Sequence, residues 1–153
     1  MIEIRLADAA DAEAISRLVI CSLRESNAGD YHPDHIAGLV AGFSPEGVLA
    51  RMKGRTTFVA IQGGEIVGTA SLGDGRVHTV FISPDLQGRG IGAALMAQVE
   101  ALAQTRAIPL LTVRSSITAE GFYQKLGYHP VREEVYGLER TIIMEKALLF
   151  PSP

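Results

Sequence analysis

Hydrophobic and polar residues alternate over residues 2–6, which predicts a first strand. Over residues 15–22 the apolar positions change to the three- and four-residue spacing of one helix face, after Asp8 and Asp11, either of which can cap a helix. Two shorter helices are expected to begin at prolines that suit a first helical turn, Pro33 and Pro45. The beginning of the chain therefore predicts one strand followed by three helices.

The middle of the chain is rich in residues that favour strands. Residues 56–61 and 66–72 are separated by Gly63-Gly64, and paired glycines accept the positive φ values of a tight hairpin turn. A second glycine turn at 73–75 leads into residues 76–82. These three segments are expected to form an antiparallel meander.

The second half of the chain is expected to alternate helices with strands. The helices are predicted at 93–104 and 118–125, and the strands at 108–113, 128–131 and 141–145. The strand that follows the first of these helices can lie parallel to the strand that precedes it. This order of elements predicts an α+β, or mixed α/β, fold built on one central sheet.

Composition narrows the class of protein. A chain of 153 residues with 47% hydrophobic and 20% charged residues fits one folded domain, expected over residues 1–153. A net charge of −3 does not favour a nucleic-acid partner. The single cysteine, Cys21, permits no internal disulfide and is interpreted as a packing residue rather than a catalytic thiol. The start lacks the features of a signal peptide and no segment has the apolar length of a membrane span, so a cytoplasmic protein without membrane contact is expected.

A glycine-rich stretch, Gln87-Gly88-Arg89-Gly90-Ile91-Gly92, lies where a predicted strand passes into a predicted helix. Backbone N–H groups can converge there without obstruction by Cβ atoms, and the helix adds its positive end and its unpaired first-turn donors. This arrangement suits a phosphate or diphosphate. A tight turn whose glycines only relieve backbone strain explains the same residues about as well.

Two motifs together resemble the GNAT superfamily, the acyl-CoA-dependent N-acetyltransferases. In the run at 80–92, Gln87, Gly90 and Gly92 fill the family's pattern of Gln or Arg, two residues, Gly, one residue, Gly or Ala. The run at 119–128 resembles the family's segment with Ala, Tyr four residues later, and a Lys-Leu-Gly-aromatic ending. The resemblance implies a mostly antiparallel sheet of about six to seven strands with a splayed parallel pair, flanked by about four helices.

The resemblance also implies acetyl-CoA as the cofactor. The strand that contains residues 80–82 would hold the pantetheine arm through its free backbone groups, one of which would polarise the thioester carbonyl. The glycine loop would hold the diphosphate. Ser116 stands where many members have Asn, and Arg89 would add charge unless it is simply solvated. The implied cofactor-binding residues are Val80, Phe81, Ile82, Gln87, Gly88, Arg89, Gly90, Ile91, Gly92, Ser116 and Ala119.

Acetyl transfer to an amine needs a neutral amine, a donor to the carbonyl oxygen and a proton for the leaving thiolate. Tyr123 is the candidate general acid, because a phenol is protonated at neutral pH; the alternative is a core aromatic residue. His78 is the candidate base, and strict alternation would place it on the same face as Val80 and Ile82. A packed or surface histidine, with ordered water passing the proton to solvent, remains open.

The expected activity is therefore transfer of acetyl from acetyl-CoA to a primary amine of a small molecule or peptide, by direct attack in a ternary complex. The alternative is a non-catalytic acyl-CoA-binding or regulatory module. Glu25, Asp30 and Asp34 would favour a cationic amine, although ordinary surface charge explains them nearly as well. His32 and His35 are not expected to bind metal, so no metal site is predicted. The resemblance also makes a homodimer a possible assembly.

Overall fold

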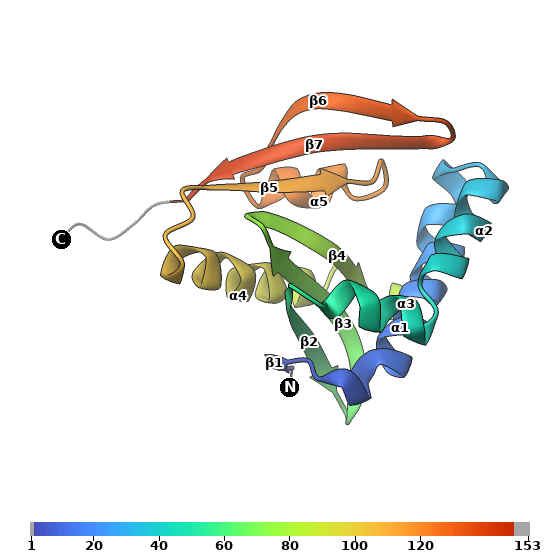
Figure 1. Cartoon of the computed structure of the whole chain (residues 1–153), viewed down its shortest axis with the longest axis horizontal. Helices are drawn as coiled ribbons and strands as arrows, with labels where there is room; N and C mark the ends of the chain where they lie inside the picture. Colours follow the sequence, from blue (N-terminus) through green and yellow to red (C-terminus); the bar gives the residue numbers. More distant parts are fainter. Residues whose placement is uncertain (1, 149–153) are drawn as a thin grey trace.

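In the computed structural model, which describes residues 2–148, a seven-stranded sheet runs in the order β1-β2-β3-β4-β5-β7-β6 (Figure 1). The strands are β1 (Glu3–Leu6), β2 (Thr56–Gln62), β3 (Glu65–Gly73), β4 (Arg76–Ile82), β5 (Leu110–Ser115), β6 (His129–Tyr136) and β7 (Glu139–Ala147). The helices are α1 (Ala12–Ser22), α2 (Pro33–Gly42), α3 (Pro45–Met52), α4 (Ile91–Thr105) and α5 (Glu120–Lys125). The predicted α+β fold is confirmed, with five α-helices among the described residues. Met1 and residues 149–153, the ends of the expected 1–153 domain, lie outside the described residues.

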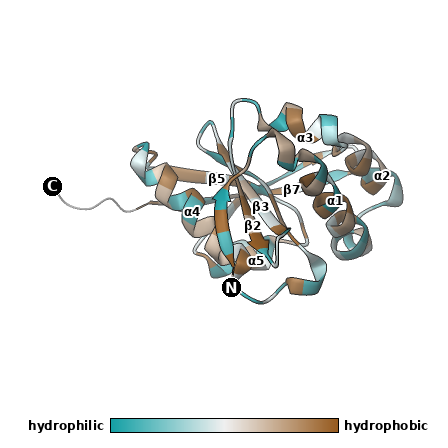
Figure 2. Cartoon of the chain, turned by 90° about the horizontal axis from the view of Figure 1, so that it is seen from below, coloured by the Kyte–Doolittle hydropathy of each residue, from teal (hydrophilic) through white to brown (hydrophobic). Residues whose placement is uncertain are grey.

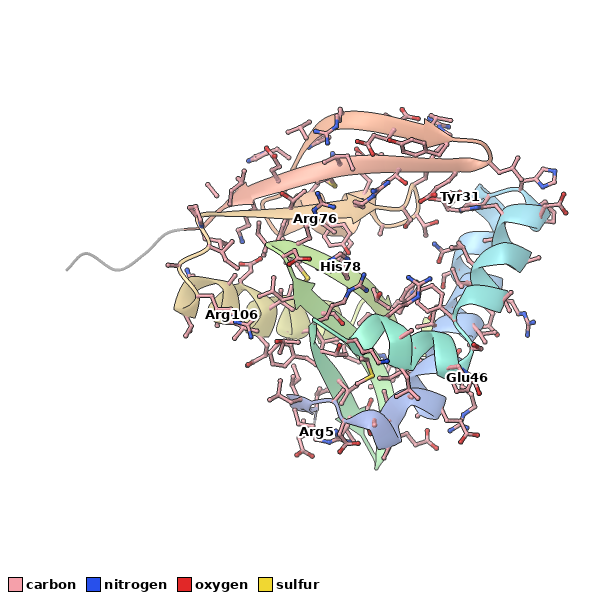
Figure 3. The ribbon with its side chains drawn as sticks, viewed as in Figure 1. Arg5, Tyr31, Glu46, Arg76, His78 and Arg106 are labelled. Carbon is pink, nitrogen blue, oxygen red and sulfur yellow. The ribbon has the colours of Figure 1, made fainter. Side chains whose placement is uncertain are left out.

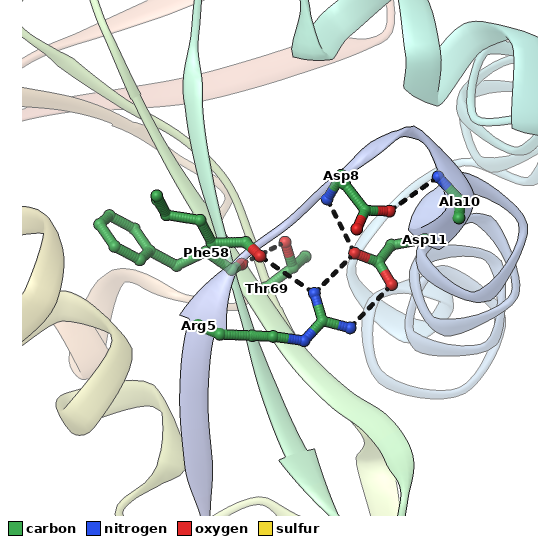
Figure 4. Close-up of polar contacts among 7 residues, drawn as sticks. Arg5, Asp8, Ala10, Asp11, Phe58 and Thr69 are labelled. Carbon is green, nitrogen blue, oxygen red and sulfur yellow. Dashed lines mark hydrogen bonds and ion pairs between the residues drawn. The ribbon is translucent and has the colours of Figure 1, made fainter.

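Both aspartates that were candidate caps take part in the start of α1 (Figure 4). The Asp8 carboxylate accepts a hydrogen bond from the Ala10 N–H at 2.9 Å, and the Asp11 carboxylate accepts one from the Asp8 N–H at 2.8 Å. Arg5 in β1 donates two more to Asp11, at 2.8 and 3.0 Å. This paired contact joins the first strand to the first helix.

The predicted meander is confirmed by the strand register. β2 pairs antiparallel with β3, and β3 pairs antiparallel with β4. The turn between β2 and β3 uses Gly63 and Gly64 at φ values of +60° and +79°, as a primed hairpin turn requires. Gly75, at φ +72°, serves the next turn.

Helices cover both faces of the sheet. One core cluster joins Leu95 and Val99 of α4 and Tyr123 of α5 to the strands, and a second joins Ile15 of α1 and Val48 of α3 to the opposite face. Figure 2 shows α4 and α5 on one side of the strands and α1 and α3 on the other. We call these the α4 face and the α1 face. Among residues 2–148 no helix is both long and apolar enough to span a bilayer.

Cys21 corrects one expectation from the sequence. It was expected to pack in the core, but its side chain is exposed on α1. The buried stripe of that helix passes instead through Ile15, Leu18 and Val19, which leaves position 21 on the outer side. The thiol therefore contributes no core packing.

The sheet parts between β4 and β5. Their parallel pairing covers only two residue pairs, Arg76 with Thr112 and Val77 with Val113. β4 continues to pair with β3 as far as Ile82, and β5 pairs with β7 as far as Ser115. The second half of β4 and the end of β5 therefore diverge, as the splayed pair was expected to do.

Candidate functional site

A cavity of about 750 Å³ opens where β4 and β5 part. Its walls come from β4, the glycine loop before α4, the end of β5 with α5, and the segments of the α1 face. All of the expected cofactor-binding residues line it except Arg89, which is exposed in the same loop. The cavity thus brings together residues from both motifs found in the sequence.

Two glycines of the loop border open space. Gly88 and Gly90 have φ values of +79° and +83°, and a Cβ built on either would meet no atom within 4 Å. Gly90 is the N-cap of α4, a 15-residue helix, and no side chain caps the first turn. The first N–H groups of α4 are therefore available to an anion, and the helix dipole favours one there.

The third glycine has a different role. A Cβ on Gly92 would lie 2.7 Å from Cε1 and 2.9 Å from Cζ of Phe122 in α5. This glycine lets the first turn of α4 approach the Phe122 ring closely. The loop therefore combines two glycines that open the backbone with one that serves packing.

Two of the cofactor-binding candidates, Gln87 and Ser116, are held by side-chain hydrogen bonds. Gln87 Nε2 donates to the Ser26 hydroxyl at 3.1 Å, which ties the loop to the π-helical segment Leu23–Asn27 that follows α1. The Ser116 hydroxyl accepts from the Ala119 N–H at 3.1 Å and so stabilises the turn before α5. Contact of Ser116 with a pantetheine arm stays a prediction.

Tyr123 packs as a core aromatic residue and also borders the cavity, while its role as a general acid stays a prediction. Its ring is only 4% exposed and packs edge-on against Phe122 and Tyr128, with centroid distances of 5.1 and 5.7 Å. It also lines the cavity, and no described residue hydrogen-bonds its hydroxyl. Burial raises the pKa of this phenol, so it stays protonated at neutral pH.

The expected orientation of His78 is wrong, because β4 contains a bulge. Between the pairs Ser71–His78 and Thr69–Phe81, β4 has two residues where β3 has one, and Thr79 adopts φ +53°. Val77 therefore packs in the α4-face cluster with Val80 and Ile82. His78 consequently belongs with the α1 face, where Phe81 packs.

His78 nevertheless lines the cavity, and Figure 3 shows it projecting from β4 toward the space between the two halves of the sheet. Its Nε2 donates to the Gly73 carbonyl at 3.2 Å, which leaves Nδ1 as the acceptor of the neutral ring. Burial, followed by the charge of Arg55, lowers its pKa, so the ring is neutral at pH 7.

The acidic residues of the α1–α2 region do not line the cavity. Glu25, Asp30 and Asp34 are outside its lining, and Asp30 accepts a hydrogen bond from the Thr118 hydroxyl at 2.6 Å. The Tyr31 hydroxyl accepts another from the Ile117 N–H, and burial raises the pKa of this phenol. Figure 3 shows Tyr31 between the start of α2 and the end of β5. These contacts tie the two segments together beside the cavity.

Tyr31, Arg51 and Arg55 are among the cavity-lining residues that sequence reasoning missed. Each comes from the helical segment before β2, and no motif singles them out, because long-range packing alone brings them to β4. Within residues 2–148 no group of three or more His, Cys, Asp or Glu residues is placed to hold a metal ion.

Comparison with known proteins gives a consistent result. Residues 27–144 match the family model described as an acetyltransferase (GNAT) domain. A GCN5-related N-acetyltransferase from Rhodopseudomonas palustris is 27% identical, with a TM-score of 0.89 over 95% of each chain. No curated protein matches the sequence significantly.

Two further solved structures share the fold. PaiA N-acetyltransferase from Thermoplasma acidophilum, in complex with coenzyme A, is 19% identical, with a TM-score of 0.80 over 96% of this chain and 99% of that one. YncA from Salmonella typhimurium, with its cofactor acetyl-CoA, is 18% identical, with a TM-score of 0.69 over 100% of this chain and 97% of that one.

Proposed function

The chain belongs to the GNAT acetyltransferase domain family, and on this premise we propose that it moves the acetyl group of acetyl-CoA to a primary amine of a small molecule or peptide. The two reactants bind together and the amine attacks directly. The observation that carries the proposal is the two-pair contact between β4 and β5, which opens the sheet into a cavity that begins at the uncapped end of α4.

The residues of the cavity fit acetyl-CoA. The first-turn N–H groups of α4, with the open backbone at Gly88 and Gly90, suit a diphosphate. The edge of β4 that faces away from β3 has no partner strand after Val77, so its backbone groups can pair with an extended amide-containing arm. When bound, acetyl-CoA supplies an acetyl group activated as a thioester.

Tyr123 is proposed as the general acid. Its phenol is protonated, lines the cavity and has no hydrogen-bond partner among the described residues. The new bond joins the amine nitrogen to the acetyl carbon while the carbon–sulfur bond breaks, and the sulfur takes the phenol's proton. The amine loses one proton as it becomes an amide, and an equivalent proton returns through the base and solvent to the Tyr123 phenolate. The products are therefore an amide and a free thiol, with Tyr123 protonated again.

His78 is proposed as the base. Its ring is neutral at pH 7, and Nδ1 is free to accept because Nε2 donates to Gly73. It lies on the α1 face, opposite to the helix that begins at the glycine loop. An amine that enters from the α1 face can therefore lose its proton to His78 directly or through one water molecule.

The proposal is tested by measuring free thiol release from acetyl-CoA across a panel of primary amines. Amine-dependent release is expected, together with a thermal upshift when acetyl-CoA alone is added. A thermal upshift without release for any amine would support the alternative of a non-catalytic acyl-CoA-binding module. The absence of both would contradict binding as well as catalysis.

A further inference from the structure

Two arginines on the α1 face of the cavity lack an acidic partner. The Arg51 guanidinium carbon lies 4.1 Å from the centre of the Phe43 ring, and the Arg55 side chain packs on Gly73. Both are half-buried and both line the cavity. Neither guanidinium group makes a hydrogen bond or an ion pair with any residue of the described part of the chain.

The arrangement holds two like charges close together away from full hydration. Burial lowers the pKa of Arg55, and the charge of Arg51 lowers it further, while Asp74 acts weakly in the opposite direction from an exposed turn. Half-buried guanidinium groups normally pair with carboxylates or phosphates, because these satisfy their planar set of donors. An oxyanion bound between these two arginines would relieve the repulsion.

The two arginines lie apart from the glycine loop. Both line a small hollow beside Thr79 of β4, and the charge of Arg55 lowers the pKa of the neighbouring His78. The loop instead follows Ile82 at the other end of the strand. Because of the bulge, His78 and Ile82 pair with Ser71 and Gly68, which are three residues apart on β3 and therefore separated by roughly 10 Å. The arginines also lie on the α1 face, while the loop leads into α4 on the opposite face. They are thus on the side proposed for the acceptor.

The other charged groups of the cavity do not neutralise these arginines. Arg114 and Arg140 have their own partners, Glu134 at 3.4 Å and Glu133 at 2.6 Å. Glu139 is the one carboxylate among the described lining residues, and it accepts a hydrogen bond from a neighbouring threonine at 3.2 Å. The acceptor side of the cavity is therefore positively charged.

We propose that the acceptor is a primary amine whose molecule also carries an oxyanion, a carboxylate or a phosphate, and that Arg51 and Arg55 bind this oxyanion. The inference rests on the proposed acetyltransfer and specifies its acceptor. It replaces the expectation that Glu25, Asp30 and Asp34 attract a cationic acceptor, because those residues do not line the cavity.

Matched acceptor pairs test the proposal on the unmodified protein. Glycine, leucine and phenylalanine are each compared with the corresponding amide, and 2-aminoethyl phosphate with ethanolamine, by thiol release from acetyl-CoA. Rates are referred to the concentration of neutral amine, because the paired amines differ in pKa. The anionic member of at least one pair is expected to have a kcat/KM at least about tenfold higher, the effect of one charge-assisted hydrogen bond. The amino-acid pairs test a carboxylate, and the 2-aminoethyl phosphate pair tests a phosphate.

Substitution of each arginine tests whether the preference for the anionic acceptor depends on its guanidinium group. Arg51→Gln and Arg55→Gln are each expected to lower kcat/KM for the anionic acceptor by roughly 10- to 100-fold, mainly through KM, with little change for its neutral counterpart. Lys53→Gln is the matched control, because it removes one positive charge between the two arginines in sequence from an exposed side chain outside the cavity lining. It is expected to leave the preference unchanged.

The outcomes separate the inference from the proposed function. Equal or better turnover of the neutral members, or a preference that survives both arginine changes, would overturn the oxyanion site and leave acetyltransfer intact. No release with any pair would also overturn it. In that case, a retained thermal upshift with acetyl-CoA would show that the protein binds the cofactor but does not use these acceptors. Loss of the upshift would contradict the proposed function as well.

Discussion

Replacing Gly92 by alanine tests whether the close approach of α4 to α5 depends on a missing side chain. The new Cβ would lie 2.7 Å from Phe122 Cε1, well inside van der Waals contact, and the ring is itself packed against Tyr123. Overpacking of this kind costs about 1–3 kcal/mol, while a glycine-to-alanine change in a helix returns up to about 1 kcal/mol. We therefore expect Gly92→Ala to lower the free energy of unfolding by about 1–2 kcal/mol, or Tm by roughly 2–8 °C.

Urea unfolding followed by circular dichroism measures this cost, and two further variants identify its source. Gly121→Ala in α5 is the control, because its Cβ would meet no atom within 4 Å, and no loss of stability is expected. Phe122→Leu removes the two ring atoms that the new Cβ would strike, so Gly92→Ala should cost less in that background. The reasoning fails if Gly92→Ala is as harmless as Gly121→Ala, or if Phe122→Leu does not reduce its cost.

The remaining predictions concern protons. Tyr123→Phe should lower kcat about 10²-fold with little change in acetyl-CoA affinity, and unchanged turnover in steady-state kinetics would remove its role as acid. His78→Gln should abolish the acid limb of kcat/KM; in the unmodified protein the lowered pKa of His78 also means that stability falls as pH drops below about 6.5, because the unfolded chain takes up the proton first. The Tm of His78→Gln should lack that part of the pH dependence, and an unaltered pH profile of Tm would argue against the assigned effect of His78. The Arg5 contact lowers the pKa of Asp11, so this carboxylate stabilises the fold at pH values above 3.8, its ordinary pKa. The contribution is lost as the pH falls through the pKa of the folded state. The Tm deficit of Asp11→Asn should therefore be present at pH 7 and shrink in acid; a deficit that is independent of pH would contradict this.

Local sequence signals were sufficient for most elements and for the glycine loop that borders the cavity. Paired glycines at 63–64 marked a hairpin turn, and the helix that intervenes between β4 and β5 indicated a parallel pair. The final hairpin was underestimated: strands expected at 128–131 and 141–145 extend to His129–Tyr136 and Glu139–Ala147. Exposed apolar residues on β6, such as Val131 and Val135, blur the alternation that would have indicated its length.

The residues on the α1 face of the cavity could not be predicted from the sequence in the same way. The bulge at Thr79 reverses the face of His78, yet threonine gives no signal of a positive φ, which glycine or asparagine would have given. Arg51 and Arg55 reach the cavity because α3 packs against α1, which is a contact between distant parts of the chain. Patterns within a short window cannot report such contacts.

The parting of β4 and β5 leaves two strand edges inside the molecule. Unpaired edges at the rim of a sheet recruit strands from other chains and promote aggregation. The rims here are β1 and the longer β6, where Pro130 removes a donor and Arg132, Glu133 and Glu134 place charges along the strand. The inner edges have no such protection in their sequence, and they are shielded instead by helices on both faces. In the ligand-free protein we expect water to satisfy these backbone groups, so that an occupant of the cavity gains affinity by exchanging that water for its own amides.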